Sequence, residues 1–203
     1  MLQSEKTEIT KRKILAAAEA EFSANGFAAT KVDDIARRAG VNKQLIYAHY
    51  ASKENLYSTI LALVYGHYAE YETVLFESEY EGIETLHNVI LQYFDFLTKN
   101  RSFVNLVLWE NLNNASYMDK VDIQLFAGIK KLLCDGIKKG MISEKLDVEQ
   151  VAHSFNVFCF SAFSNIHTIS RLTHKNLDTE DELKKRAEHI ADVLTKYIAN
   201  ADK

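Results

Sequence analysis

Residues 30–56 read TKVDDIARRAGVNKQLIYAHYASKENL, and this stretch decides the fold of the N-terminal part of the chain. Apolar residues recur at helical spacing over 32–39 and again over 43–50, which predicts two short helices. Gly40 suits the end of the first helix, and Asn42 is a favourable N-cap for the second. A three-residue turn that contains glycine, between two short helices, is typical of a helix-turn-helix.

The second short helix has the side chains that a DNA-reading helix needs at its N-terminal end. Lys43 and Gln44 begin this helix, and Tyr47 lies on the same face one turn later. Lysine can pair with the guanine N7/O6 edge and glutamine with the adenine N6/N7 edge. The flanking positions expected to reach phosphates are Thr30, His49 and Lys53.

The composition favours helices along the whole chain. The 203 residues include no proline and seven glycines, so little turn chemistry is left for hairpins. A first helix is expected over 10–25 and a long one from residue 53, and the later ranges are 82–99, 102–112, 116–139, 148–172 and 179–200. We therefore predict an all-α protein of about nine helices, with a three-helix head (1–52) and a larger helical body (53–203).

Charge and cysteine content narrow the class of protein. Residues 1–56 contain nine Lys or Arg and seven Asp or Glu, a net charge of +2, and the remainder carries −6. A mildly basic head is compatible with nucleic-acid binding. The first dozen residues do not read as a signal peptide, and no stretch is apolar enough to span a membrane. We expect a soluble cytoplasmic protein in which Cys134 and Cys159 are small buried side chains.

The spacing of the head closely resembles the helix-turn-helix of the TetR family of transcriptional regulators. The matching run is Gly40-Val41-Asn42, then Ile46-Tyr47-x-His49-Tyr50-x-Ser52-Lys53-Glu54-x-Leu56, preceded by Phe22, Gly26, Thr30, Ile35 and Ala36. The resemblance covers about residues 10–57. It implies that Lys43, Gln44 and Tyr47 face bases, and that Thr30, the Leu45 backbone, Tyr47, His49 and Lys53 line phosphates, beside the cap Asn42. Asn42 stands where the family often has Ser and Gln44 where it often has Gly, which leaves the operator sequence open.

The resemblance also implies a small-molecule cavity in the body and a homodimer that binds a palindromic operator in double-stranded DNA. Aromatic side chains interleaved with polar ones suit such a cavity, although core packing is the favoured interpretation for any single aromatic residue. The predicted ligand contacts are Tyr65, Tyr68, Trp109, Asn113, Phe158 and His167. The predicted dimer contacts, on two apolar stripes that alternatively face the chain's own core, are Val151, Phe155, Phe158, Ala162, Ile190, Leu194 and Tyr197.

Other functions have weaker support in the sequence. No Gly-rich phosphate loop, HExxH, CxxC or GxSxG motif occurs, so we predict no catalytic residues, no metal site and no cofactor. His167 and His174, seven residues apart, are a weak metal alternative. A redox-responsive regulator built on Cys134 and Cys159, and a helical adaptor that binds protein instead of DNA, remain as alternatives. The favoured function is a repressor that a small molecule releases from its operator.

Overall fold

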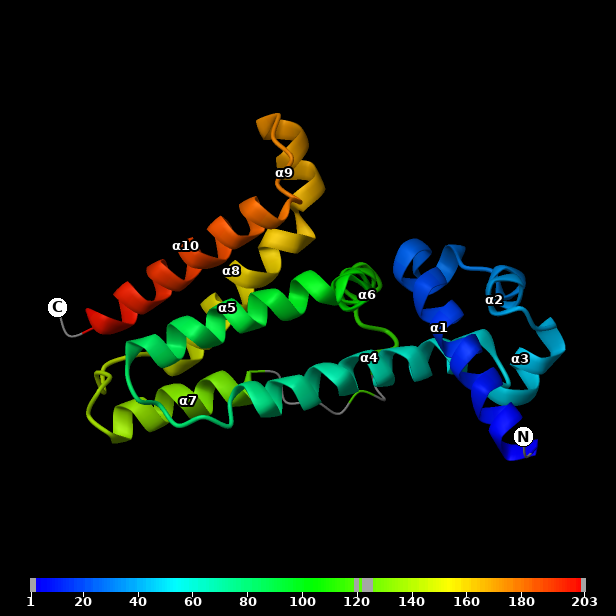
Figure 1. Ribbon diagram of the computed structural model, residues 1–203, viewed down its shortest axis with the longest axis horizontal. Coiled ribbons are helices and arrows are strands. Elements are labelled where there is room, and N and C mark those ends of the chain that lie inside the picture. The colour runs from blue at the N-terminus through cyan, green and yellow to red at the C-terminus, as the bar shows by residue number, and fades with distance from the viewer. Residues whose placement is uncertain (1–2, 119–120, 122–125, 202–203) are drawn as a thin grey trace. The chain divides into compact units, whose positions relative to one another are not determined.

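The computed structural model describes residues 3–118, 121 and 126–201, and these residues form ten α-helices and no strand (Figure 1). The predicted all-α fold is confirmed. The helices are α1 (Gln3–Ala29), α2 (Val32–Ala39), α3 (Lys43–Tyr50), α4 (Lys53–Leu75), α5 (Ile83–Lys99), α6 (Arg101–Leu112), α7 (Ala127–Lys138), α8 (Val148–Ser164), α9 (Ile166–Thr173) and α10 (Glu180–Ala199).

Two predicted helices differ from the structure for local reasons. The helix expected over 148–172 is interrupted at Asn165, which separates α8 from α9. The helix expected from residue 116 begins at Ala127 instead. Asn114 and Ala115 both have a φ of 54°, and the Ala115 N–H donates to the Glu110 carbonyl at 2.7 Å. This turn ends α6, and residues 119–120 and 122–125 of the expected helix lie outside the described residues.

The described chain divides into two compact units. The first contains residues up to 68 together with 101–123, and the second contains 69–100 together with the residues from 124 onward. Helix α6 therefore belongs with α1, α2 and α3 in the first unit, although it is far from them in sequence. The predicted boundary between residues 52 and 53 stays a prediction.

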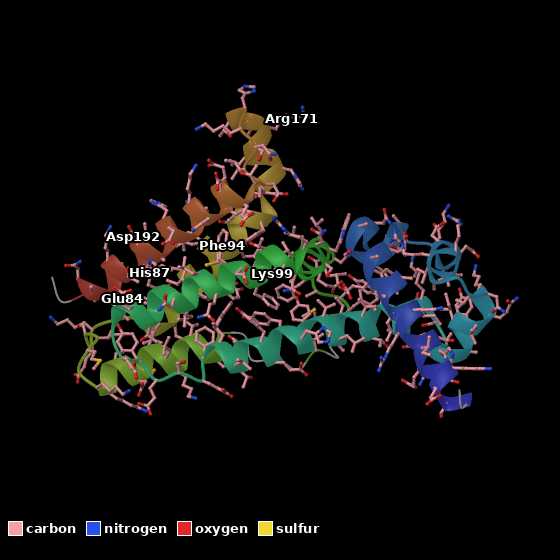
Figure 2. The ribbon with its side chains drawn as sticks, in the orientation of Figure 1. Glu84, His87, Phe94, Lys99, Arg171 and Asp192 are labelled. Atoms are coloured by element: carbon pink, nitrogen blue, oxygen red, sulfur yellow. The ribbon has the colours of Figure 1, made fainter. Side chains whose placement is uncertain are left out.

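The second unit is built around α5, which contacts α8 and α10. Figure 1 shows these three helices side by side. The ring of Phe94 on α5 lies 4.7 Å from that of Phe163 on α8. His87, labelled with Phe94 on α5 in Figure 2, places its Nε2 atom 3.3 Å from Glu188 Oε2 on α10. Burial of such aromatic pairs supplies most of the packing free energy of a helical unit. Among the described helices, none combines the length and the apolar character needed to cross a membrane.

Candidate nucleic-acid interface

The turn between α2 and α3 is fixed by its backbone. Gly40 adopts the left-handed conformation (φ 69°, ψ 35°), which glycine accepts at little cost and which ends α2. The N–H of Val41 then donates to the Ala36 carbonyl at 3.0 Å. The Asn42 side chain accepts the Leu45 N–H at 2.8 Å and so caps the first turn of α3. Asn42 thus has the capping role expected from the sequence.

Packing on one face of α3 leaves its opposite face exposed. Ile46 of α3 is buried, as are Val32 and Ile35 of α2, and the two helices contact each other. Gln44 is exposed, and Tyr47 is 40% exposed. The structure therefore brings polar side chains together on the exposed side of a short helix whose orientation is fixed by its buried side.

Lys43, the third predicted base-reading residue, is held in an ion pair. Its Nζ atom lies 2.8 Å from Asp33 Oδ2 on α2. The hydrogen bond between the two groups raises the pKa of Lys43 and lowers the pKa of Asp33. Both groups are charged at neutral pH, and the contact between Asp33 and Lys43 was not predicted from the sequence.

The residues predicted to reach phosphates have different positions. Thr30 is buried, and its hydroxyl oxygen lies 2.7 Å from the Gly26 carbonyl oxygen and 3.1 Å from that of Glu21. Its hydroxyl therefore satisfies the end of α1, and in this structure it does not face solvent. His49 is half-buried, with its ring 6.2 Å from that of Tyr50.

Lys53 lies against the end of α1. Its ammonium nitrogen is 4.4 Å from the centroid of the Phe27 ring and 3.5 Å from the Ala28 carbonyl oxygen. Partial burial lowers the pKa of Lys53. A cation over an aromatic face is attracted to the ring, so a phosphate contact would have to compete with this position.

Helix α6 makes polar contacts with α1 and α4 that the sequence did not predict. The Trp109 Nε1–H donates to the Ser23 carbonyl at 3.1 Å. Glu110 is 2% exposed, and its carboxylate accepts the Tyr57 hydroxyl at 2.8 Å and the Tyr117 N–H at 3.1 Å. Burial, followed by the bond to Glu110, raises the pKa of Tyr57. A buried carboxylate needs such donors, and these bonds join α6 to α1 and to the start of α4 within the first unit.

The six predicted ligand contacts are divided between the two units, and their role in binding a ligand stays a prediction. Tyr65, Tyr68, Trp109 and Asn113 lie in the first unit, and Phe158 and His167 lie in the second. The Tyr68 ring stacks on Phe103 with 5.0 Å between centroids. His167 is exposed on α9. Helical periodicity identifies which side chains share a face, but it does not identify which faces enclose a cavity.

Three cavities of the second unit have none of these six residues in their walls. One of 430 Å³ lies between the end of α4 and α5, and one of 450 Å³ lies between the end of α4 and α7. A third, of 390 Å³, lies between α8, α9 and α10 and includes Ile166, Leu183 and Arg186. All three volumes are within the range of small-molecule sites.

The predicted dimer contacts are divided between core and surface. Val151, Phe155, Ile190 and Leu194 are buried inside the chain's own second unit, because their stripes pack against neighbouring helices. These four side chains therefore contribute to the core of the second unit, and their predicted role in a dimer interface stays a prediction. Phe158 and Tyr197 are exposed, and Ala162 is half-buried.

The two cysteines on which a redox-responsive regulator would depend have different environments. Cys159 is buried, and this burial raises the pKa of its thiol, which disfavours the reactive thiolate. Cys134, expected to be buried, is exposed. Within the described part of the chain, no group of three or more His, Cys, Asp or Glu has a metal-binding arrangement.

Comparisons with known proteins agree with this architecture. Residues 14–60 match the family model for bacterial regulatory proteins of the tetR family, and residues 83–194 match that for a tetracyclin repressor-like C-terminal domain. The chain is 23% identical over 175 residues to the transcriptional repressor NicS of Pseudomonas putida, covering 83% of this chain and 82% of that protein. Both family models together extend from the helix-turn-helix into α10.

Solved structures share the fold at low sequence identity. The fatty acid degradation regulator FadR of Bacillus halodurans superposes with a TM-score of 0.72 at 18% identity, covering 92% of this chain and 94% of that one. FadR of Bacillus subtilis, solved in complex with stearoyl-CoA, gives a TM-score of 0.60 at 20% identity, covering 91% of this chain and 97% of that one.

Proposed function

The chain belongs to the TetR family of bacterial regulatory proteins, and from this premise we propose that it is a transcriptional repressor that a small molecule releases from DNA. One observation carries the DNA-binding half of the proposal. Helix α3 has its buried face fixed by Ile46, its N-terminus capped by Asn42, and Gln44 and Tyr47 exposed. A recognition helix needs this combination.

The proposed base readout follows from the chemistry of the first turn of α3. The Gln44 amide matches the donor and acceptor of the adenine major-groove edge, and the Lys43 ammonium matches the two acceptors of guanine. Tyr47, one turn later, is placed to contact the backbone or a base beside them. Asn42 and His49 stay proposed contacts at the edges of this surface. Thr30 and Lys53 stay proposed phosphate contacts only if their side chains leave the positions described above.

We further propose a homodimer on a palindromic operator. Two recognition helices must meet the major groove about one helical turn, roughly 34 Å, or a multiple of it apart, and a two-fold axis provides such spacing. Helices α8 and α10 contact each other and have exposed apolar residues, namely Val157, Phe158, Val193 and Tyr197. The predicted contact Ala162 lies one turn beyond Phe158 on α8.

The proposed effector is a small molecule bound in the second unit. Support comes from the cavities of that unit and from the relative solved with stearoyl-CoA. An effector lowers operator affinity only as far as it prefers the state that does not bind DNA. The six predicted ligand contacts stay proposals, and because the curated relatives that match this chain are regulators, we propose no catalytic role.

Fluorescence anisotropy tests the DNA-binding proposal with the DNA flanking this protein's own gene. Wild type, Lys43→Ala/Gln44→Ala and the matched control Lys145→Ala/Gln150→Ala are compared over a salt series. The control removes the same side chains from exposed positions of the second unit. We expect steep salt dependence for wild type and control, and loss of sequence discrimination only in the α3 variant. An adaptor that binds protein would have no such DNA affinity.

A further inference from the structure

An ion pair crosses the turn of the helix-turn-helix and joins α2 to the first residue of α3. It is formed by Lys43 Nζ and Asp33 Oδ2 at 2.8 Å, and the two side chains are 42% and 62% exposed. Exposed ion pairs contribute little to folding free energy, because water and salt screen them. We therefore consider how the pair affects DNA binding by the Lys43 ammonium group, and not its effect on stability.

The geometry leaves Lys43 able to read a base. A lysine ammonium group has three N–H donors, and Asp33 accepts one of them. Two N–H donors remain, which is enough to contact both the N7 and the O6 acceptor of guanine. A side chain that is already held also loses less conformational entropy when it binds.

The same carboxylate disfavours contacts with the DNA backbone. Without a partner, lysine is a flexible point charge that reaches any phosphate in range, whatever the sequence. A carboxylate beside the ammonium cancels its net charge, and it repels phosphates that approach the pair. Phosphate contact gives affinity without sequence information, whereas base contact gives discrimination.

We propose that Asp33 is a specificity-determining residue of the α3 surface, whose carboxylate directs Lys43 to a base edge and away from phosphates. This inference rests on the proposed DNA-binding function. Asp33 acts through Lys43, so it is a positioning residue and needs no base contact of its own.

The neighbouring Asp34 provides a matched control. It also lies in the first turn of α2, and its carboxylate pairs with Arg37, at 2.7 Å, instead of Lys43. Asp33→Asn and Asp34→Asn each remove one negative charge from the same helix. A difference between the two variants therefore reports the contact with Lys43 rather than net charge.

The experiment measures anisotropy for full-length wild type, Asp33→Asn and Asp34→Asn. Each protein is titrated with an operator selected by wild type, with single-base-pair variants of that operator, and with a random duplex of equal length. Freeing Lys43 adds about one phosphate contact to random DNA, so Asp33→Asn should bind it about eightfold more tightly at 0.1 M salt and about twofold at 0.5 M. Asp33→Asn should also lose discrimination at the base pair where Lys43→Met loses it.

Asp34→Asn should change the affinities for the operator and for the random duplex by the same factor. Its discrimination between the operator and the single-base-pair variants should stay as in wild type. Equal behaviour of Asp33→Asn and Asp34→Asn would overturn the inference, as would a further loss of discrimination when Asp33→Asn is added to Lys43→Met. Thermal unfolding of each variant establishes that the head is folded. If wild type selects no DNA sequence, the proposed function fails and the inference fails with it; if it selects one and the two Asn variants agree, only the inference fails.

Discussion

Gly26→Ala is expected to destabilise the first unit strongly. Gly26 has φ 69° and ψ 175°, a region that only glycine occupies readily, so alanine there costs about 1–3 kcal/mol. An alanine Cβ would lie 2.7 Å from Cδ2 and 2.8 Å from Cε3 of Trp109. Carbon atoms pack at roughly 3.5–4.0 Å, so the indole must move, and overpacking of this kind costs about 1–3 kcal/mol. The sum is a loss of about 2–6 kcal/mol.

Chemical unfolding in urea measures this loss. Trp109 is the chain's single tryptophan, so its fluorescence reports both the transition and the displaced ring. For a chain of this size, a loss near the middle of the range lowers the unfolding midpoint temperature by roughly 10 °C. The matched control is Gly66→Ala in α4, where no heavy atom lies within 4 Å of the new Cβ. Alanine should stabilise that helix by up to about 1 kcal/mol.

A second background separates the two causes. With Trp109→Ala already present, and unfolding followed by far-UV circular dichroism because the tryptophan is gone, the steric part disappears and Gly26→Ala should cost only the backbone part, about 1–3 kcal/mol. Wild-type stability of the single variant Gly26→Ala would refute the reasoning altogether. If Gly26→Ala lowered the free energy of unfolding equally with and without Trp109, the contact with the indole would contribute nothing. The backbone conformation of Gly26 alone would then explain the loss.

Three further outcomes are expected. Asn42→Ala removes the cap on Leu45 and should cost about 1 kcal/mol in urea unfolding; no change would mean that the cap does not stabilise α3. Tyr57→Phe leaves the buried Glu110 carboxylate without one donor and should cost about 1.5–3 kcal/mol, a loss that a neutral Glu110→Gln in the same background should reduce. Burial raises the pKa of Tyr65 from 10.0 to about 12, so the folded state holds that phenol proton more tightly. Stability should be complete below pH 10 and fall as the pH rises to 12, by up to about 2.7 kcal/mol, and Tyr65→Phe should lose less.

The head was predictable from sequence because its signals are local. Gly40 ends α2 through its own backbone conformation, and Asn42 caps the first turn of α3. On that short helix Ile46 is buried, whereas Gln44 and Tyr47 are exposed. Each signal lies within a few residues of the feature that it determines. The helix-turn-helix and the all-α fold were therefore confirmed.

Contacts between different helices were not predictable in the same way. A stripe such as Val151 and Phe155 looks the same in sequence whether it packs on its own helices or on a second copy, and the structure buries it inside the chain. The contact between Asp33 and Lys43 depends on how α2 and α3 cross. The bond from Tyr57 to Glu110 joins residues 53 positions apart. Periodicity carries no information on such pairings.

The contact of α6 with α1 was not predictable for the same reason. Trp109 stands out in sequence as an aromatic residue of the body, and in the structure its indole donates to the Ser23 carbonyl of α1. The glycine that accommodates the indole, Gly26, reads in sequence only as a helix end. The close approach of the two becomes visible only once α1 and α6 are placed.

The most direct test of the account is selection of DNA by the wild-type protein from a random pool, followed by sequencing. We expect enrichment of two inverted half-sites whose centres are about one helical turn, or a multiple of it, apart. Lys43→Ala/Gln44→Ala should fail to enrich the same half-site. A pool that stays random after repeated selection by the folded wild-type protein would contradict the claim that α3 reads DNA.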